Sequence, residues 1–156
     1  MKEIILDTET TGLSVKEGHR IVEIGCIELE NFIPTNNNFH CYLNPGRKVS
    51  EKALETHGYT DEFLSDKKKF NEIVDDFLLY IKGKKLIIHN AEFDLSHLNN
   101  ELKIAGKNLI NNEISDNNQA LKTNISYFKK VIKPSEEEKR NHERYLKINL
   151  KKNFFN

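Results

Sequence analysis

Two acidic residues one position apart close an apolar run near the start of the chain. Ile4, Ile5 and Leu6 precede Asp7, and Glu9 follows after one threonine. Because residues i and i+2 of a strand point to the same side, both carboxylates can stand together at a strand end. Close like charges repel unless a cation lies between them, and oxygen-only ligands suit Mg²⁺ or Mn²⁺. A solvated strand end would show the same pattern, so the pair alone does not establish a metal site.

A second acidic position follows the same logic further along the chain. An apolar run over residues 86–88 leads through His89 and Asn90 to Asp94. Asn90 suits an N-cap, which places Asp94 in the first turn of a helix, where an acid gains from the helix dipole. Helix stabilisation by itself would account for Asp94, but two such segments in one chain favour a shared acidic site.

The two segments together resemble the motifs of the DEDD superfamily of 3′→5′ exonucleases. Within it the similarity is to the DnaQ-like group, the epsilon-type proofreading exonucleases of bacterial DNA polymerase III. Residues 7–13, Asp-Thr-Glu-Thr-Thr-Gly-Leu, resemble the first motif, and residues 89–94, His-Asn-Ala-Glu-Phe-Asp, resemble the second. The resemblance covers residues 3–106, including the stretches 17–25, 38–40 and 57–64.

The resemblance implies an α/β fold of the ribonuclease H-like type, a mixed sheet flanked by helices that is incomplete at its C-terminal end. It also implies two-metal hydrolysis of phosphodiesters at DNA 3′ ends. Asp7 would bridge two divalent cations, Mg²⁺ or Mn²⁺, while Glu9 would bind the ion on the nucleophile side. Asp94 would hold the second ion. His57 would lie near the terminal nucleotide and bind substrate with Asp7 and Glu9, although a turn histidine with only local partners is the alternative.

The family's third motif is missing from this chain. That motif is a histidine followed five residues later by an aspartate, which supply the general base and the last metal ligand. The position five after His142 is Lys147, and the position five before Asp116 is Asn111. His142 is the remaining candidate for the base, but its charged neighbours favour a solvated surface residue. We therefore expect an under-ligated site that could hold only one ion, and loss of a base costs roughly 10²–10⁴-fold in rate.

Composition changes near Gly106. Residues 1–106 carry 13 Lys and Arg against 18 Asp and Glu, whereas residues 107–156 carry 11 against 6. The second part contains nine Lys and ten Asn but no glycine. We expect an exonuclease-like core over residues 1–106 and a divergent Lys/Asn-rich segment over residues 107–156. That segment would be either a basic arm for nucleic acid or a replaced C-terminus.

Apolar patterning predicts strands and helices in an order typical of α/β proteins. The predicted strands cover residues 3–8, 20–29, 37–44 and 85–89, and the predicted helices cover residues 51–56, 70–82 and 92–105. Residues 32–37 are expected to form a turn. Cys26 and Cys41 fall in predicted strands and are expected to be buried free thiols.

The remaining features describe an ordinary soluble chain of one domain. It has 156 residues, 37% hydrophobic and 31% charged, and no apolar run approaches the ~20 residues of a membrane span. The first strand begins almost at once, which leaves no room for a signal peptide, so we expect a cytoplasmic protein with no membrane partner.

Three functional hypotheses remain open. The first is a DnaQ-like exonuclease that acts on single-stranded or frayed DNA 3′ ends, with weak or no turnover, beside a DNA polymerase III catalytic subunit. The second is a non-catalytic module that keeps the fold and binds nucleic acid or a polymerase. The third is an active enzyme in which Asp116, Glu143 or another subunit supplies the missing groups.

Overall fold

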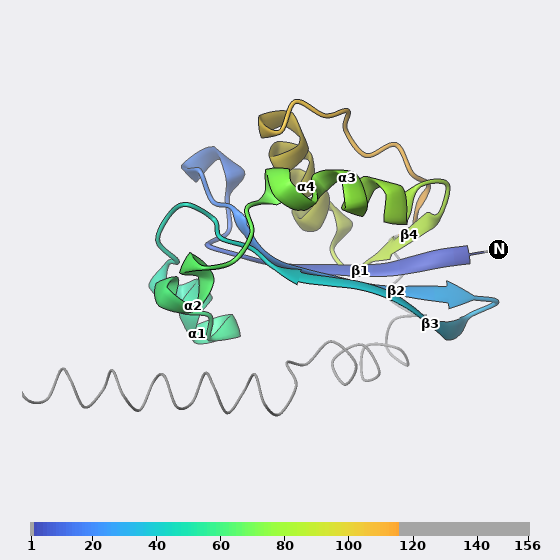
Figure 1. The fold of residues 1–156 in the computed structure, drawn as a ribbon, viewed down its shortest axis with the longest axis horizontal. Helices are drawn as coiled ribbons and strands as arrows, with labels where there is room; N and C mark the ends of the chain where they lie inside the picture. Colours follow the sequence, from blue (N-terminus) through green and yellow to red (C-terminus); the bar gives the residue numbers. More distant parts are fainter. Residues whose placement is uncertain (1, 116–156) are drawn as a thin grey trace, which may run out of the picture.

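The computed structural model describes residues 2–115, which form a five-stranded sheet with helices packed on it (Figure 1). The strands are β1 (Lys2–Thr10), β2 (Ile21–Glu30), β3 (Ile33–Tyr42), β4 (Lys85–Ile88) and β5 (Ile114–Ser115). The helical segments are a 3₁₀ turn, η1 (Val15–Glu17), and the helices α1 (Glu51–His57), α2 (Asp61–Ser65), α3 (Phe70–Ile81) and α4 (Ala91–Ile104).

The N-terminal strand lies in the middle of the sheet. The strand order is β3-β2-β1-β4-β5. β1 pairs antiparallel with β2 and parallel with β4, so the sheet is mixed. The parallel pair places the C-terminal end of β1 beside the start of α4, because α4 begins directly after β4. The expected α/β class is confirmed, and the two acidic segments meet at one end of the sheet.

One face of the sheet carries the main hydrophobic core. α3 and α4 cover this face in Figure 1. The buried side of α3 has the i, i+3, i+4 spacing expected from the sequence, and its core residues are Phe70, Ile73, Val74, Phe77 and Ile81. They pack with sheet residues that share one face by alternation, namely Ile4, Leu6, Ile24, Cys26, Leu86 and Ile88. A smaller buried cluster lies on the opposite face and consists of Ile5, Ile27, Leu29 and Ile87.

The hairpin between β2 and β3 differs from the expected turn. β3 begins at Ile33, so residues 33–37 belong to a strand and only Asn31 and Phe32 form the connection. Both residues have positive φ, 51° and 66°, the combination that a two-residue hairpin turn requires. Pro34 is tolerated because β3 lies at the edge of the sheet, where a missing backbone donor costs little. The proline therefore misled the sequence-based boundary.

The other element bounds agree with the predicted ones to within two residues. α2 was not predicted, although Thr60 caps it by accepting a hydrogen bond from the Phe63 amide. Cys26 is buried, Cys41 is partly buried and both are free thiols, as expected. Burial raises the pKa of Cys41 to about 12. Within residues 2–115, no helix has the length and apolarity needed to span a membrane.

Candidate active site

β1 presents its polar residues alternately to the two faces of the sheet. Thr8 is buried and follows Leu6 on the face covered by α4, whereas Asp7 and Glu9 point the other way. Asp7 is exposed and Glu9 is half-buried. The i, i+2 placement of the two acids predicted from the sequence is therefore present at the C-terminal end of this strand.

Asp94 reaches β1 between the two acids. Its Oδ1 accepts hydrogen bonds from the Thr8 amide at 3.0 Å and from the Thr8 hydroxyl at 2.6 Å. The carboxyl is 3% exposed. Burial, with a further contribution from the nearby charge of Asp7, raises the pKa of Asp94 to about 7, although both Thr8 hydrogen bonds oppose the rise. The structure thus brings the second acidic segment into electrostatic contact with the first.

The start of α4 has a different geometry from a conventional cap. Asn90 occupies the N-cap position, as expected, but its φ of 56° is left-handed and its side chain makes no capping bond. Its carbonyl instead accepts a hydrogen bond from the Phe93 amide at 3.0 Å. Asparagine tolerates this conformation better than most residues, so the tight turn from β4 into α4 suits it.

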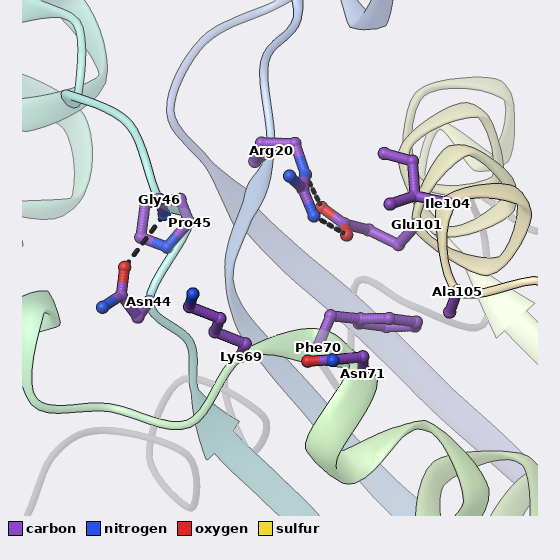
Figure 2. Close-up of a pocket in the computed structure, with 10 residues that line it drawn as sticks. All are labelled: Arg20, Asn44, Pro45, Gly46, Lys69, Phe70, Asn71, Glu101, Ile104 and Ala105. Atoms are coloured by element: carbon purple, nitrogen blue, oxygen red, sulfur yellow. Dashed lines mark hydrogen bonds and ion pairs between the residues drawn. The ribbon is translucent and has the colours of Figure 1, made fainter.

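A second contact fixes α4 two turns further along. The Arg20 guanidinium donates to both carboxylate oxygens of Glu101, at 2.7 and 2.6 Å, and the Ile21 amide donates to Glu101 at 3.2 Å. Figure 2 shows this pair at the edge of a cavity of about 280 Å³ that also contains Lys69. Because Glu101 is buried and its partner forms a planar fork, the pair sets the rotation of α4 and with it the direction of Asp94.

His57 joins the α1–α2 connection to the end of β1. Its Nε2 donates to the Thr10 carbonyl at 3.0 Å, while its Nδ1 accepts a hydrogen bond from the Tyr59 amide at 3.0 Å. The His57 and Tyr59 rings stack with centroids 4.8 Å apart. Burial lowers the pKa of His57, which favours the neutral ring that this bonding needs. Both ring nitrogens are already engaged, so His57 offers a surface to a ligand and no spare donor.

Tyr59 is in turn held by an acid on β2. Its hydroxyl donates to Glu23 Oε2 at 2.8 Å, and His40 Nε2 lies 2.6 Å from Glu23 Oε1. Glu23 pairs with Glu9 in the β1–β2 register, so the two carboxylates occupy neighbouring positions on one face. The hydrogen bonds from Tyr59 and His40 draw the Glu23 charge toward β3 and α2.

A cleft of about 750 Å³ opens at this end of the sheet. It lies between β1, the loop after β1 and helix α1. The lining residues are Thr8, Glu9, Thr10, Gly12, Leu13, Glu17, His19, Ser50, Glu51, Lys52, Ala53, Thr56, His57 and Phe93. The predicted site residues Glu9 and His57 therefore share one cleft, and Thr8 and Phe93 connect it to the Asp94 carboxyl behind them.

Sequence comparison identifies the family. Residues 4–154 match the Exonuclease family. The chain belongs to this exonuclease family. Among curated relatives, the DNA polymerase III subunit epsilon of Rickettsia conorii is 56% identical over 104 residues, and that of Escherichia coli K12 is 46% identical over 112 residues. These alignments cover 67% and 69% of this chain but 45% and 46% of the relatives, so the chain spans about half their length.

Solved exonucleases share the fold of this family member. Exonuclease I superposes with a TM-score of 0.67 at 15% identity, covering 74% of this chain and 28% of its own. Exonuclease X in complex with 5′-overhanging duplex DNA gives a TM-score of 0.53 at 22% identity, covering 79% and 72%. The ribonuclease H-like α/β fold expected from the two motifs is confirmed. The family match extends past Gly106, and the division of the chain at that residue stays a prediction.

Exonucleases of this family use divalent metal ions. The donors at the end of β1 fit such ions chemically, because carboxylates are hard oxygen ligands and the raised pKa of Asp94 reflects an acid awaiting a positive charge. Within residues 2–115, however, no three His, Cys, Asp or Glu side chains already surround one point as a metal cage would. Whether Asp7, Glu9 and Asp94 share an ion therefore stays a prediction. His142 lies outside the described residues.

Several residues that build the site carry no sequence signal of their own. Thr8 could have been noticed only because it separates the two acids, and Arg20 and Glu101 are 81 positions apart. His97 is buried on the same side of α4, and its Nε2 has no partner among the described residues. Such contacts depend on the tertiary arrangement and leave no local pattern.

Proposed function

We propose that this chain is an epsilon-type proofreading exonuclease that hydrolyses the terminal phosphodiester at single-stranded or frayed DNA 3′ ends, with impaired activity. The carrying observation is the buried Asp94 carboxyl bonded to Thr8 between Asp7 and Glu9. The curated relatives, named as DNA polymerase III epsilon subunits, support the proofreading role. The solved exonuclease X holds DNA, which supports a nucleic-acid substrate for the shared fold.

Asp7, Glu9 and Asp94 would hold Mg²⁺ or Mn²⁺ in this proposal. Such ions, when bound, supply charge stabilisation at the scissile phosphate and activation of the attacking water. The chain's own residues provide the scaffold. Thr8 orients the Asp94 carboxyl, and His57 anchors helix α1 to the Thr10 carbonyl at the cleft wall. Leu13 and Phe93 add apolar surface in the same cleft, which suits the face of a nucleobase.

The proposed impairment rests on the missing third motif. No histidine after Asp94 is followed five residues later by an aspartate, so the sequence offers no matched pair for the base and the last ligand. With one ligand lost, only one ion would be bound tightly. The proposed turnover is therefore far below that of a complete exonuclease, because positioning of the strand would survive while proton removal from the attacking water would not.

Single-turnover digestion of a 3′-labelled oligonucleotide tests the activity. The natural chain is compared with Asp7→Ala and His142→Ala in Mg²⁺ and in Mn²⁺. Slow digestion that Asp7→Ala abolishes and His142→Ala leaves unchanged supports the impaired exonuclease. Robust digestion lost in both variants would contradict the impairment and make His142 the base. Robust digestion that persists in His142→Ala points to Asp116, Glu143 or another subunit as the source of the missing groups.

The absent motif also favours a second candidate function, a non-catalytic module. A chain that binds the oligonucleotide without digesting it under any of these conditions supports this candidate. The proposed partner of either form is a DNA polymerase III catalytic subunit, as suggested by the naming of the relatives. Co-elution of the full chain with that subunit in size-exclusion chromatography tests the partnership, and separate elution at micromolar concentration contradicts it.

A further inference from the structure

His19 stands on the wall of the cleft in the loop between β1 and β2. The loop is tied down at both ends, because the Thr11 amide donates to the Arg20 carbonyl at 2.8 Å and the Ser50 amide donates to the Thr11 carbonyl at 3.0 Å. The 3₁₀ turn η1 lies between these anchors. His19 is therefore carried by a fixed frame and not by a free loop.

The hydrogen bonds of Thr11 decide which nitrogen of His19 carries a proton. The Thr11 hydroxyl oxygen accepts from the Arg20 amide at 3.0 Å and lies 2.9 Å from His19 Nδ1. Thr11 is fully buried, so its own proton needs an acceptor, and His19 Nδ1 provides it. A neutral His19 then bears its proton on Nε2, and a charged His19 bears one there as well. In both forms Nε2–H is a donor directed away from Thr11.

Gly12 provides the seat for the His19 ring. A Cβ at position 12 would overlap three atoms of the imidazole, Cε1, Nε2 and Nδ1. The ring therefore lies flat against the Gly12 backbone. Together with the Nδ1 contact to Thr11, this packing leaves the Nε2–H donor with one orientation in the cleft.

The present partner of that donor is a weak one. Glu17 Oε2 lies 3.4 Å from His19 Nε2, longer than a good hydrogen bond, and the Glu17 side chain is 71% exposed. An exposed carboxylate at this distance contributes little energy, so another anion can replace it. Glu17 marks the place where the His19 donor receives negative charge.

The charges of the cleft indicate which ligand would use this donor. Glu9, Glu17 and Glu51 line it and repel a phosphodiester strand. His57 has both nitrogens engaged, which leaves Lys52 and His19 as the described basic side chains able to offset that repulsion. Resting on the function proposed above, we propose that His19 Nε2–H donates to a backbone phosphate oxygen of the bound strand and that Glu17 competes with this phosphate. His19 is thus a substrate-binding residue.

Two replacements of His19 separate the donor from the packing. In His19→Asn the amide can still contact Thr11 but cannot reach the cleft, whereas in His19→Gln the amide nitrogen takes the place of Nε2. Both lose the ring that covers Gly12, so they are matched for packing. Affinity is measured by fluorescence anisotropy with a 5′-labelled oligothymidylate in Ca²⁺. We expect about 5–10-fold weaker binding for His19→Asn, the value of one hydrogen bond to a charged group, and near-natural binding for His19→Gln.

Glu17→Gln adds a test that unfolding cannot imitate, since it should strengthen binding by about threefold through loss of a competing charge. A second probe with neutral methylphosphonates at its last two linkages should bind the natural chain and His19→Asn equally. Equal affinity of the natural chain and His19→Asn for the ordinary probe would overturn the His19 contact alone. A natural chain that binds neither probe would overturn the proposed function itself, so the two failures are distinguishable.

Discussion

The hydroxyl of Thr8 donates to Oδ1 of Asp94 at 2.6 Å, joining residues 86 positions apart at the end of the central strand. The Thr8 amide donates to the same oxygen. Through this one carboxylate oxygen, the first acidic segment and the start of α4 are held in a fixed relation. The second oxygen of Asp94 remains for the charge that the acidic site attracts.

The raised pKa of Asp94 predicts a pH dependence of stability in metal-free buffer. The pKa is about 7 in the folded state against a model value of 3.8, so the folded state binds the proton more tightly. Stability is then greatest below pH 4 with respect to this group and falls as pH rises from about 4 to 7. Asp94→Asn cannot titrate, so its unfolding free energy should lack this fall, by roughly 2–4 kcal/mol.

Thermal melts of both proteins in EDTA between pH 5 and pH 8 measure the effect. Asp76→Asn, an exposed acid on α3, serves as the control and should follow the natural chain. Parallel curves for the natural chain and Asp94→Asn would show that Asp94 is ionised across this range.

Replacement of Thr8 by valine should cost stability through the buried carboxyl. Thr8→Val removes the 2.6 Å donor and leaves Asp94 with the amide alone, for an expected loss of about 1–3 kcal/mol. Thr10→Val is the matched control, because Thr10 is also buried on β1 but donates to the Gly12 carbonyl. Both variants should be destabilised in denaturant melts. Only Thr8→Val should also shift the pH dependence assigned to Asp94, and a shift in both would contradict that assignment.

Divalent metal binding should depend on Asp7. Calorimetric titration of the natural chain with Mn²⁺ should release or absorb heat, and Asp7→Ala should give none. The affinity should weaken as pH falls, because protons compete for the same carboxylate oxygens. Asp76→Ala provides a charge-matched control on a helix face away from the cleft. Identical titrations for the natural chain and Asp7→Ala would exclude a metal site at the end of β1.

The β2–β3 turn offers a stabilising substitution. Phe32 has a φ of 66° and an exposed side chain, so it bears the strain of a left-handed conformation and gains little burial. Phe32→Gly should raise the unfolding free energy by about 1 kcal/mol, because Asn-Gly suits a turn with two positive φ angles. Phe32→Ala keeps a Cβ and should give no such gain. Equal melting temperatures for the glycine and alanine variants would contradict the strain argument.

Glu28 should stabilise the fold in a pH-dependent way. Its buried carboxylate accepts from Lys2, Thr35 and Asn37 and lies 2.8 Å from the Lys84 ammonium. The Lys84 contact, followed by the other donors, lowers its pKa from 4.5 to about 2. This stabilisation is present above pH 4.5 and is lost as pH falls toward 2. Glu28→Gln should therefore be less stable at pH 7, by about 1–3 kcal/mol, and the difference should shrink on acidification. Glu30→Gln, at an exposed position, should show no such difference.

The sequence by itself determined the fold class, the family and the main core stripe. The motifs at residues 7–13 and 89–94 are local, since each is read from a few neighbouring residues at the end of a strand. The stripe on α3 follows from helical periodicity in the same way. Boundaries were less secure where local rules compete, as at Pro34, which is acceptable in β3 only because that strand lies at the sheet edge.

Only the tertiary structure decided how the site is held. Arg20 finds Glu101, Thr8 finds Asp94 and Tyr59 finds Glu23 through strand pairing and helix packing, which bring together positions 36 to 86 apart. The same packing buries Asp94 and so raises its pKa, whereas its place in a first helical turn would predict a lowered one. Burial and charge proximity are properties of the assembled fold, and no single segment of the chain encodes them.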